Sequence, residues 1–419
     1  MISPHVNSLL QSKRVLLLQG PLGGFFSKFS QWLNTQGIQT FKINFNGGDA
    51  FFSKNIERCF SYTDSPQNYS KWIEQFILNH EIDAVVCFGD CRYYHRVTKT
   101  ITKKNRIKFF AFEEGYIRPN FITFEEDGVN FYSNFLHHIQ EKKELDQQQK
   151  IQEIKDVNSS YYLMVGCAIT YYLFMLLGSF KYSKYQHHRM LKIWQEVLYW
   201  CLSAFRRVKN HFIEVSKFEN FIKRHKQEYF VFALQVHNDF QIRTHSQLGC
   251  VRKYIGVVIQ DFALNAHSHH HLVLKHHAMD RGYRHYGNEI QRLAKLYGVE
   301  GRIHYFCDVH LPTLLKNGLG FVTINSTTGI QALYHGIPTK ALGYALYNLP
   351  KLTYNYRLAN FWVNPGKVDT EYFQKFRIEL IGYSQLNGSF YGSSPWMSEV
   401  ILNKSQDKAH QLKKDLLKM

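Results

Sequence analysis

Two runs of alternating apolar and helix-like stretches constrain the fold of this chain more than any other feature of its sequence. The first run occupies the first third, where helices are expected over 25–36 and 69–79. The second begins after about residue 228 and includes a helix expected over 282–296. Such alternation is typical of a parallel sheet covered by helices on both faces. The expected strands lie at 15–19, 40–45, 84–88, 108–112, 230–234, 272–275, 303–306 and 321–325.

With 419 residues the chain is long enough for two domains of ordinary size. We therefore predict an α/β protein of the GT-B type, in which two Rossmann-like domains face a central cleft. In such sheets, ligands bind at the carboxyl ends of the strands. The predicted division is an N-terminal domain (1–140), a helical insertion (141–227), a C-terminal domain (228–372) and C-terminal helices (373–419).

The insertion contains Tyr161–Phe180, twenty residues without a formal charge, directly followed by the basic residues Lys181 and Lys184. Its length and flanks fit a transmembrane helix, but one crossing would separate the two halves of the chain. A return crossing through 193–205 looks too short and includes Gln195 and Glu196. We favour a helix pair that lies on or dips into the membrane surface. A helix buried in the protein is the other interpretation.

The formal net charge of +18 favours anionic partners. No RNA- or DNA-binding motif is present, so we expect no nucleic acid partner and favour anionic lipid or nucleotide substrates. The seven cysteines are scattered without a CxxC pair, as in a reduced cytoplasmic protein. The first residues contain no apolar stretch of signal-peptide length, so we expect no export.

The acidic turn Glu113-Glu114-Gly115 follows a predicted buried strand, and Arg118 comes shortly after it. Adjacent carboxylates raise one another's pKa, which suits proton transfer, and an ionised carboxylate can attack a sugar carbon or stabilise a cationic one. Gly115 permits a sharp turn. The alternative is a surface turn with solvated acids.

Two segments of the second half have the chemistry to bind phosphate. Lys275 and His277 follow one strand. Another strand is followed by a hydroxyl-rich turn and a short helix, whose N-terminus would attract an anion. Plain helix capping is the alternative there. The histidines upstream of Lys275 have no Cys or carboxylate at ligand spacing, so we expect no metal site. The residues of the turn are Asn325, Ser326, Thr327, Thr328 and Gly329.

Two further loops are candidates for substrate contacts. The first follows the first strand and contains Gln19, Gly20, Pro21 and Gly23, without the pattern of a dinucleotide-binding loop or a P-loop. It would let an acceptor approach the backbone, or it is simply a tight connection. The second, in the stretch LQVHNDFQI (234–242), includes Gln235 and Asp239.

Together these motifs resemble the capsule polysaccharide synthesis family, in particular its KpsS/LipB-type members, which are β-Kdo transferases. The matching stretches keep their order along both halves, and one departure is that the family's His-Pro pair reads His277-Ala278 here. This loses the fixed φ of proline and keeps the imidazole. The stretches are LQGPLGGFF (18–26), INFNGGD (43–49), FEEGYIRP (112–119), LQVHNDFQI (234–242), KHHAMDRG (275–282) and NSTTGIQALYHGIPTKALGYALYNLPKLT (325–353).

The resemblance implies transfer of β-Kdo from CMP-Kdo, bound by the C-terminal domain, to an anionic glycerophospholipid. It implies (lyso)phosphatidylglycerol as acceptor, on the N-terminal side, and a peripheral location at the inner face of the plasma membrane, possibly with other capsule assembly proteins. Glu114 would be the catalytic carboxylate, supported by Glu113. His277 and Ser326-Thr327 would contact the CMP phosphate, with no cofactor and no metal.

Two other function classes stay open at this point. One is a different CMP-sugar transferase, similar to a sialyltransferase, with a soluble acceptor. The other is a non-catalytic scaffold for capsule assembly. The family resemblance favours retention of configuration with Glu114 as nucleophile, but the sequence leaves inversion open, in which case the same carboxylate would deprotonate the acceptor.

Overall fold

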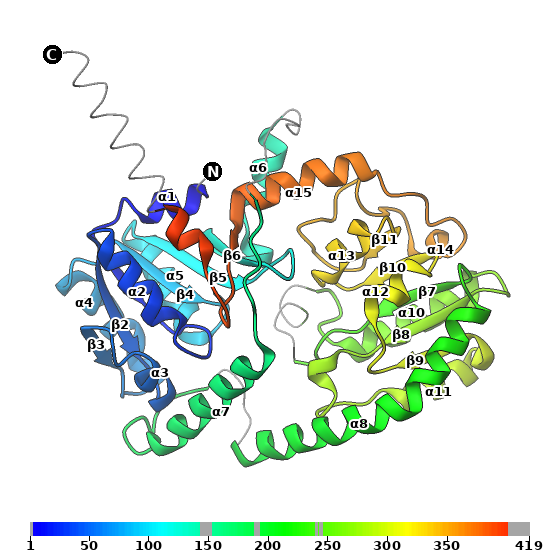
Figure 1. Ribbon diagram of the computed structural model, residues 1–419, viewed down its shortest axis with the longest axis horizontal. Helices are drawn as coiled ribbons and strands as arrows, with labels where there is room; N and C mark the ends of the chain where they lie inside the picture. Colours follow the sequence, from blue (N-terminus) through cyan, green and yellow to red (C-terminus); the bar gives the residue numbers. More distant parts are fainter. Residues whose placement is uncertain (1–2, 143–152, 188–192, 239–241, 243–245, 401–419) are drawn as a thin grey trace. The chain divides into compact units, whose positions relative to one another are not determined.

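The computed structural model describes residues 3–142, 153–187, 193–238, 242 and 246–400. The chain divides into two compact units (Figure 1). The first unit contains residues 1–190 and 378–419, and the second contains residues 191–377. Each unit is an α/β body with its own sheet, as the alternation of strands and helices predicts.

The first unit is built on a seven-stranded sheet with the order β12-β6-β5-β4-β1-β2-β3. The strands from β3 to β5 are parallel, β6 runs antiparallel to β5, and β12 runs antiparallel to β6. All four strands predicted in this half are confirmed. The strands are β1 (Arg14–Leu17), β2 (Gln39–Asn44), β3 (Arg58–Ser61), β4 (Ala84–Phe88), β5 (Lys108–Glu114), β6 (Phe121–Glu126) and β12 (Gln385–Asn387).

Helices cover both faces of this sheet, because successive strand residues point to opposite sides. Leu17 of β1 packs with Phe29 of α2, whereas Leu16 packs with Ile73 of α4 and Ile101 of α5. The α-helices of this unit are α1 (Pro4–Leu9), α2 (Phe25–Thr35), α3 (Gly47–Phe52), α4 (Tyr69–Asn79), α5 (Tyr93–Lys104), α6 (Phe135–Glu141) and α7 (Tyr161–Leu177).

The second unit has a fully parallel five-stranded sheet with the order β11-β10-β7-β8-β9. Phe230 and Phe232 of β7 pack on one side with α10 and α11, and Val231 packs on the other side with Phe218 and Phe221 of α8. The strands are β7 (Tyr229–Ala233), β8 (His271–Lys275), β9 (Ile303–Phe306), β10 (Gly320–Thr323) and β11 (Thr339–Ala341).

The helices of the second unit precede, connect and follow its strands. The longest, α8, has 32 residues and precedes β7. The helix predicted over 282–296 begins later, at Gly287. The α-helices are α8 (Ile193–Arg224), α10 (Val251–Asn265), α11 (Gly287–Leu296), α12 (Leu311–Lys316), α13 (Thr328–Tyr334), α14 (Leu358–Phe361) and α15 (Thr370–Ser384), the last of which runs on into the first unit.

The segment 141–227 is divided between the two units instead of forming one insertion, because α7 packs on α3 and α8 packs on the sheet of the second unit. Among the residues that the structure describes, no helix has the length and apolarity needed to cross a membrane. Nor is α7 a buried helix, since Tyr171 is its one buried residue. The region expected as C-terminal helices also contributes a strand, β12, to the first sheet.

Candidate active edges of the two sheets

The candidate residues of the first unit lie at the edge of its sheet where the parallel strands end. Leu17 of β1 pairs with Val86 of β4 and Lys42 of β2, and Phe88 of β4 pairs with Phe112 of β5. This register brings the acidic end of β5 and the glycine-rich loop after β1 to the same edge. Ligands of open α/β sheets bind at this edge.

Side chains from β6 and β12 fix the backbone of the acidic turn. The hydroxyl of Thr123 donates to the carbonyl oxygen of Glu114 at 3.1 Å. The side-chain oxygen of Gln385 accepts from the backbone N–H groups of Tyr116 (2.9 Å) and Ile117 (3.3 Å). The turn is therefore held by a neighbouring strand and by Gln385, which lies more than 250 residues later in the sequence.

Gly115 is required by a close approach of two backbone segments. A Cβ atom at this position would overlap the carbonyl oxygen of Phe121. Its φ does not lie in the positive range, so the conformational freedom of glycine is not what the turn uses. Arg118 donates from Nε to the carbonyl oxygen of Gly115 at 3.3 Å, which keeps its guanidinium beside the acids.

The two carboxyl groups have different surroundings. Glu113 is half-buried, and burial raises its pKa to about 7, with the Glu114 and Asp90 charges adding to the shift and Arg92 opposing it. Glu114 is exposed at the surface, yet desolvation by the protein around it also raises its pKa, against the effect of Arg118. A carboxyl group with a pKa near 7 can both donate and accept a proton at neutral pH.

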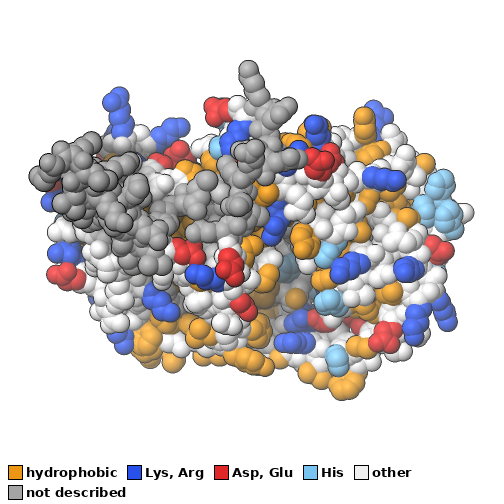
Figure 2. Space-filling model, turned by 45° about the horizontal axis from the view of Figure 1, so that its top comes forward, with side chains coloured by type: hydrophobic (Ala, Val, Ile, Leu, Met, Phe, Trp, Pro, Cys, Tyr) orange, Lys and Arg blue, Asp and Glu red, His pale blue; other side chains and the backbone are white. Residues whose placement is uncertain are grey.

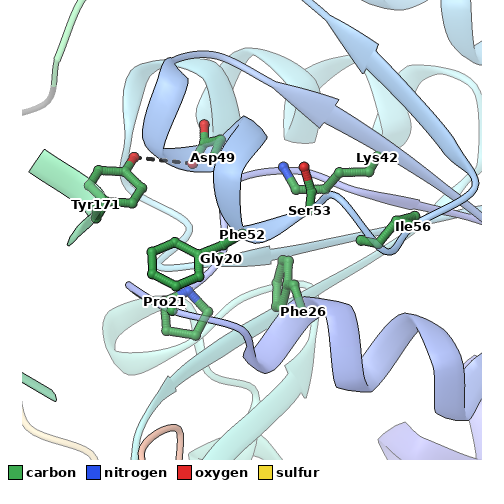
Figure 3. A pocket seen from close by; sticks show the side chains of 10 residues that line it. Gly20, Pro21, Phe26, Lys42, Asp49, Phe52, Ser53, Ile56 and Tyr171 are labelled. Atoms are coloured by element: carbon green, nitrogen blue, oxygen red, sulfur yellow. Dashed lines mark hydrogen bonds between the residues drawn. The ribbon is translucent and has the colours of Figure 1, made fainter. Parts of the chain in front are cut away.

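A small pocket lies beside the glycine-rich loop (Figure 3). Its polar wall is a hydrogen-bonded group around Asp49. Gln19 donates to Asp49 at 3.1 Å, and Tyr171 of α7 donates to the other carboxylate oxygen at 3.1 Å. The pocket is lined by Gly20, Pro21, Gly23, Phe26, Lys42, Asp49, Phe52, Ser53, Ile56 and Tyr171.

Asn46, Asp49 and Tyr171 are site residues that the sequence did not single out, although the first two lie in the quoted stretch 43–49. Asn46 donates to the Tyr171 hydroxyl at 2.7 Å and accepts from the Asp49 N–H at 3.0 Å. Gly47 and Gly48 let α7 come this close, because a Cβ at Gly48 would lie 2.6 Å from the Tyr171 carbonyl oxygen. The stretch 43–49 therefore holds α7 in place and also forms part of the pocket wall.

In the second unit, Lys275 and two histidines mark the end of β8. Lys275 donates to the carbonyl oxygens of His276 (2.8 Å) and Cys307 (2.7 Å), and burial lowers its pKa. His277 accepts from the backbone N–H of Met279 at 3.2 Å and so caps a short 3₁₀ turn. The Lys275 ammonium therefore ties the ends of two strands together.

His237 and Asp280 form a pair at the same edge that the sequence did not select. Asp280 is fully buried and accepts hydrogen bonds from both the ring Nδ1 and the backbone N–H of His237, the latter at 3.1 Å. A buried carboxylate in this position fixes the orientation of the histidine ring. His237 belongs to the quoted stretch 234–242, but its partner lies in another loop.

The ends of β7 and β10 are joined by a pair of amide hydrogen bonds. Gln235 donates to the side-chain oxygen of Asn325 at 3.0 Å and accepts from its backbone N–H at 3.1 Å. Both residues were predicted as substrate contacts, and the structure brings them together. Asp239 lies outside the described residues.

In the hydroxyl-rich turn, the first backbone N–H groups of α13 donate hydrogen bonds to atoms of the turn itself. The N–H of Thr328 donates to Ser326 Oγ at 3.2 Å, and that of Gly329 to the Ser326 carbonyl at 3.0 Å. Thr327 occupies the N-cap position without a side-chain hydrogen bond to the helix. An anion at this turn would therefore depend on side-chain hydroxyls more than on the seven-residue helix α13 itself.

The fold and these two edges define the class of the protein. Each unit is a Rossmann-like α/β body with polar, titratable residues at the carboxyl ends of its parallel strands, and two such bodies in one chain are the components of a GT-B fold.

Comparison with known proteins gives the family. The model of the family described as "Capsule polysaccharide biosynthesis protein" matches residues 83–391. The chain is 38% identical to the capsule polysaccharide export protein KpsS of Escherichia coli over 91% of this chain and 98% of that one. It is 37% identical to the capsule polysaccharide modification protein LipB of Neisseria meningitidis over 93% and 95% of the two chains. A solved structure, the beta Kdo 2,7 transferase KpsC of Thermosulfurimonas dismutans, has 12% identity, coverage of 93% and 99%, and a TM-score of 0.41. The chain belongs to the capsule polysaccharide biosynthesis protein family.

Proposed function

We propose that this chain is a glycosyltransferase of capsule synthesis that moves β-Kdo from CMP-Kdo to (lyso)phosphatidylglycerol, starting the Kdo linker of a capsular polysaccharide. The observation that carries the proposal is the pair of carboxyl groups, Glu113 and Glu114, fixed at the carboxyl edge of a Rossmann-like sheet with raised pKa values. Membership of a capsule biosynthesis family supports the same reaction class.

We assign donor binding to the edge of the second unit. A CMP leaving group needs its phosphate charge neutralised more than it needs a proton, and preorganised donors supply this. His277, the His237–Asp280 pair and the hydroxyls of Ser326 and Thr327 provide such donors. Lys275 contributes its positive charge next to them, although its hydrogens are directed to backbone carbonyls. The proposed reaction uses no metal and no cofactor.

We assign the covalent chemistry to the first unit. In the retaining reaction, the Glu114 carboxylate forms a bond to the anomeric carbon of Kdo while the bond to the CMP phosphate oxygen breaks. The acceptor hydroxyl then forms its bond to the same carbon, the bond to Glu114 breaks, and the hydroxyl proton passes to a base. Glu113, with its pKa near 7, suits that base.

The acceptor proposal includes contact with the inner face of the plasma membrane, and exposed apolar side chains on α7 and α8 support it. On α8, Phe205, Val208, Phe212 and Val215 follow a three- and four-residue spacing and are 42–80% exposed. Residues three and four apart lie on one face of a helix. The same helix carries the exposed basic residues Arg207, Lys209 and Lys217. Apolar anchors with basic flanks are typical of helices that lie on anionic membranes. The exposed large apolar residues of α7 are Tyr161, Tyr162, Leu163, Ile169, Leu173, Leu176 and Leu177.

Mass spectrometry of the lipid product tests the function. Purified protein with CMP-Kdo and lyso-phosphatidylglycerol is expected to yield the lipid with one or more added Kdo residues. Glu114→Gln should lower turnover by at least about 100-fold, because removing a nucleophile or base costs a factor of this order. Glu300→Gln, an exposed acid of the second unit, is the matched control and should keep full turnover.

Three outcomes of this assay would count against the proposal. Near-wild-type turnover by Glu114→Gln would remove the assignment of that residue. Transfer from CMP-sialate in preference to CMP-Kdo, to a soluble acceptor, would favour the sialyltransferase-like alternative. The absence of turnover with either donor, in a correctly folded protein that still binds other capsule proteins, would favour the scaffold.

A further inference from the structure

Three histidines and a glutamate gather at the opposite edge of the second sheet, where its strands begin. His225 directly follows α8, Glu228 precedes β7, and His271 is the first residue of β8. His304 is the second residue of β9. Since all strands of this sheet are parallel, this edge is the one away from Gln235, His277 and Ser326, and the cluster has no part in the proposed transfer.

The potential ligand atoms of this cluster lie close together. The Nδ1 atom of His225 is 3.3 Å from a carboxylate oxygen of Glu228, and Nδ1 of His271 is 3.1 Å from Nε2 of His304. One ligand atom from each of His225, Glu228 and His271 lies within 4.8 Å of the others. Zinc bonds of about 2.0–2.1 Å in a tetrahedron separate neighbouring ligand atoms by roughly 3.3 Å. The two pair distances, 3.3 and 3.1 Å, are close to that value.

The backbone holds these residues in place without a metal. The N–H of His271 donates to the Glu228 carbonyl at 2.9 Å, and the N–H of Glu228 donates to the His225 carbonyl at 3.1 Å. The ring of Phe221 packs against the imidazoles of His304 and His225, with centroids 4.5 and 5.1 Å away. The His225 and His304 side chains therefore pack against an apolar ring.

The cluster is partly open to solvent. The His225 side chain is 25% exposed. The Glu228 side chain is 47% exposed, so an ion has access from solvent.

We propose that His225, Glu228 and His271, with His304 as a fourth candidate ligand, form a zinc site that joins the end of α8 to the starts of strands β8 and β9. Imidazole and carboxylate are ligands that zinc accepts, and among common divalent ions zinc binds such sets tightly and takes tetrahedral geometry. The site is structural. Within the described part of the chain, it is the one group of metal-binding side chains with this spacing.

The proposal revises the expectation from sequence. The histidine run 267–271 has no acid or cysteine at ligand spacing, which argued against a metal. Only His271 of that run belongs to the cluster, because its partners come from other elements. His267 and His269 are exposed and lie outside it, which makes them suitable controls.

Zinc binding by the untagged full chain, first stripped of metal with a chelator, tests the proposal. Calorimetry is expected to show one saturable Zn²⁺ site, and Zn²⁺ is expected to raise the melting temperature. Co²⁺ should give the visible absorption of tetrahedral coordination. His225→Gln with His271→Gln should weaken the affinity by at least about ten-fold. His267→Gln with His269→Gln should leave it unchanged.

Two results would overturn the zinc site. One is a wild-type chain that binds no zinc stoichiometrically, shows no rise in melting temperature and gives no tetrahedral Co²⁺ spectrum. The other is equal loss of affinity in both double variants, which would indicate adventitious binding by surface histidines. If the His225/His271 variant does not fold, the wild-type measurements decide alone. Kdo transfer is not the readout, so failure of the zinc site and of the proposed function remain distinguishable.

Discussion

At the scale of single residues, the acidic turn shows how surroundings assign different properties to neighbouring acids. Glu113 and Glu114 are adjacent in sequence and carry the same group, but only Glu113 is sheltered by the sheet. Its carboxylate accepts the N–H of Glu114 at 3.0 Å, which partly offsets the cost of burial. The proton-transfer role and the nucleophile role therefore belong to different residues in the proposed reaction.

The raised pKa of Glu113 makes stability depend on pH. Its pKa in the folded protein is about 7, against 4.5 for the free group, so the folded state holds more protons between these values. Stability should consequently fall as pH rises from about 4.5 to 7, by up to roughly 3 kcal/mol. Glu113→Gln removes this dependence. Urea unfolding at pH 5 and pH 8 measures it.

The prediction is decided by comparing the free energies of unfolding of the wild type and the Glu113→Gln variant at the two pH values. The variant is expected to gain stability relative to the wild type at pH 8 and to lose that advantage at pH 5. If the urea midpoints of the wild type and the variant changed equally with pH, the prediction would be wrong. Glu81→Gln, whose side chain is 75% exposed, serves as the control and should follow the wild type.

At the scale of elements, glycines decide which segments can approach one another. Gly115 lies against the backbone of Phe121, and Gly47 and Gly48 lie against that of α7. The strands and helices with strong apolar patterns were predicted from sequence. The strands β6 and β12 were not predicted. The edge strand β12 has only three residues, and its pairing partner β6 lies more than 250 residues earlier.

Substitution of glycine by alanine tests this role of Gly115. Gly115→Ala should lower the free energy of unfolding by at least about 1–3 kcal/mol, because the new methyl group forces the turn and β6 apart. Kdo transfer should fall as well, since the turn carries Glu114. The matched change Gly24→Ala places its methyl group in open space and should alter stability by less than about 1 kcal/mol. If Gly115→Ala and Gly24→Ala lowered the free energy of unfolding equally, this role of Gly115 would be wrong.

At the scale of the whole molecule, charge and exposed apolar surface favour a membrane partner. The chain carries 51 basic and 33 acidic residues, and Figure 2 shows Lys and Arg side chains spread over the visible face. Such a distribution attracts anionic surfaces over about a Debye length, roughly 8 Å at physiological salt. Electrostatic attraction between the net positive charge of the protein and an anionic membrane should be weak. The exposed apolar residues of α7 and α8 are therefore expected to determine stable attachment to the membrane.

Flotation with liposomes tests this attachment. The wild type should float with vesicles that contain phosphatidylglycerol, less so at high salt, and only weakly with neutral vesicles. Phe205→Ser with Phe212→Ser should reduce flotation several-fold. Leu264→Ser with Leu296→Ser removes comparably exposed apolar residues from α10 and α11 and should have little effect. Flotation that is independent of anionic lipid, or equally reduced in both variants, would count against membrane docking.

The sequence by itself determined the two α/β halves, the positions of their main strands along the chain and most of the residues at their carboxyl edges. It did so because buried parallel strands appear as short apolar runs, and polar residues that directly follow such runs must emerge at one edge. Local patterns of this kind need no knowledge of distant contacts.

Only the tertiary structure decided which residues far apart in sequence meet. It placed α7 with the first unit and α8 with the second, and it paired His237 with Asp280 and Gln19 with Asp49. It also brought His225, Glu228 and His271 together at the opposite edge of the second sheet. The physical reason is that these contacts depend on the register of the strands and on the close approach of backbone segments at glycines. Both are determined by pairing between distant segments, so no local sequence pattern predicts them.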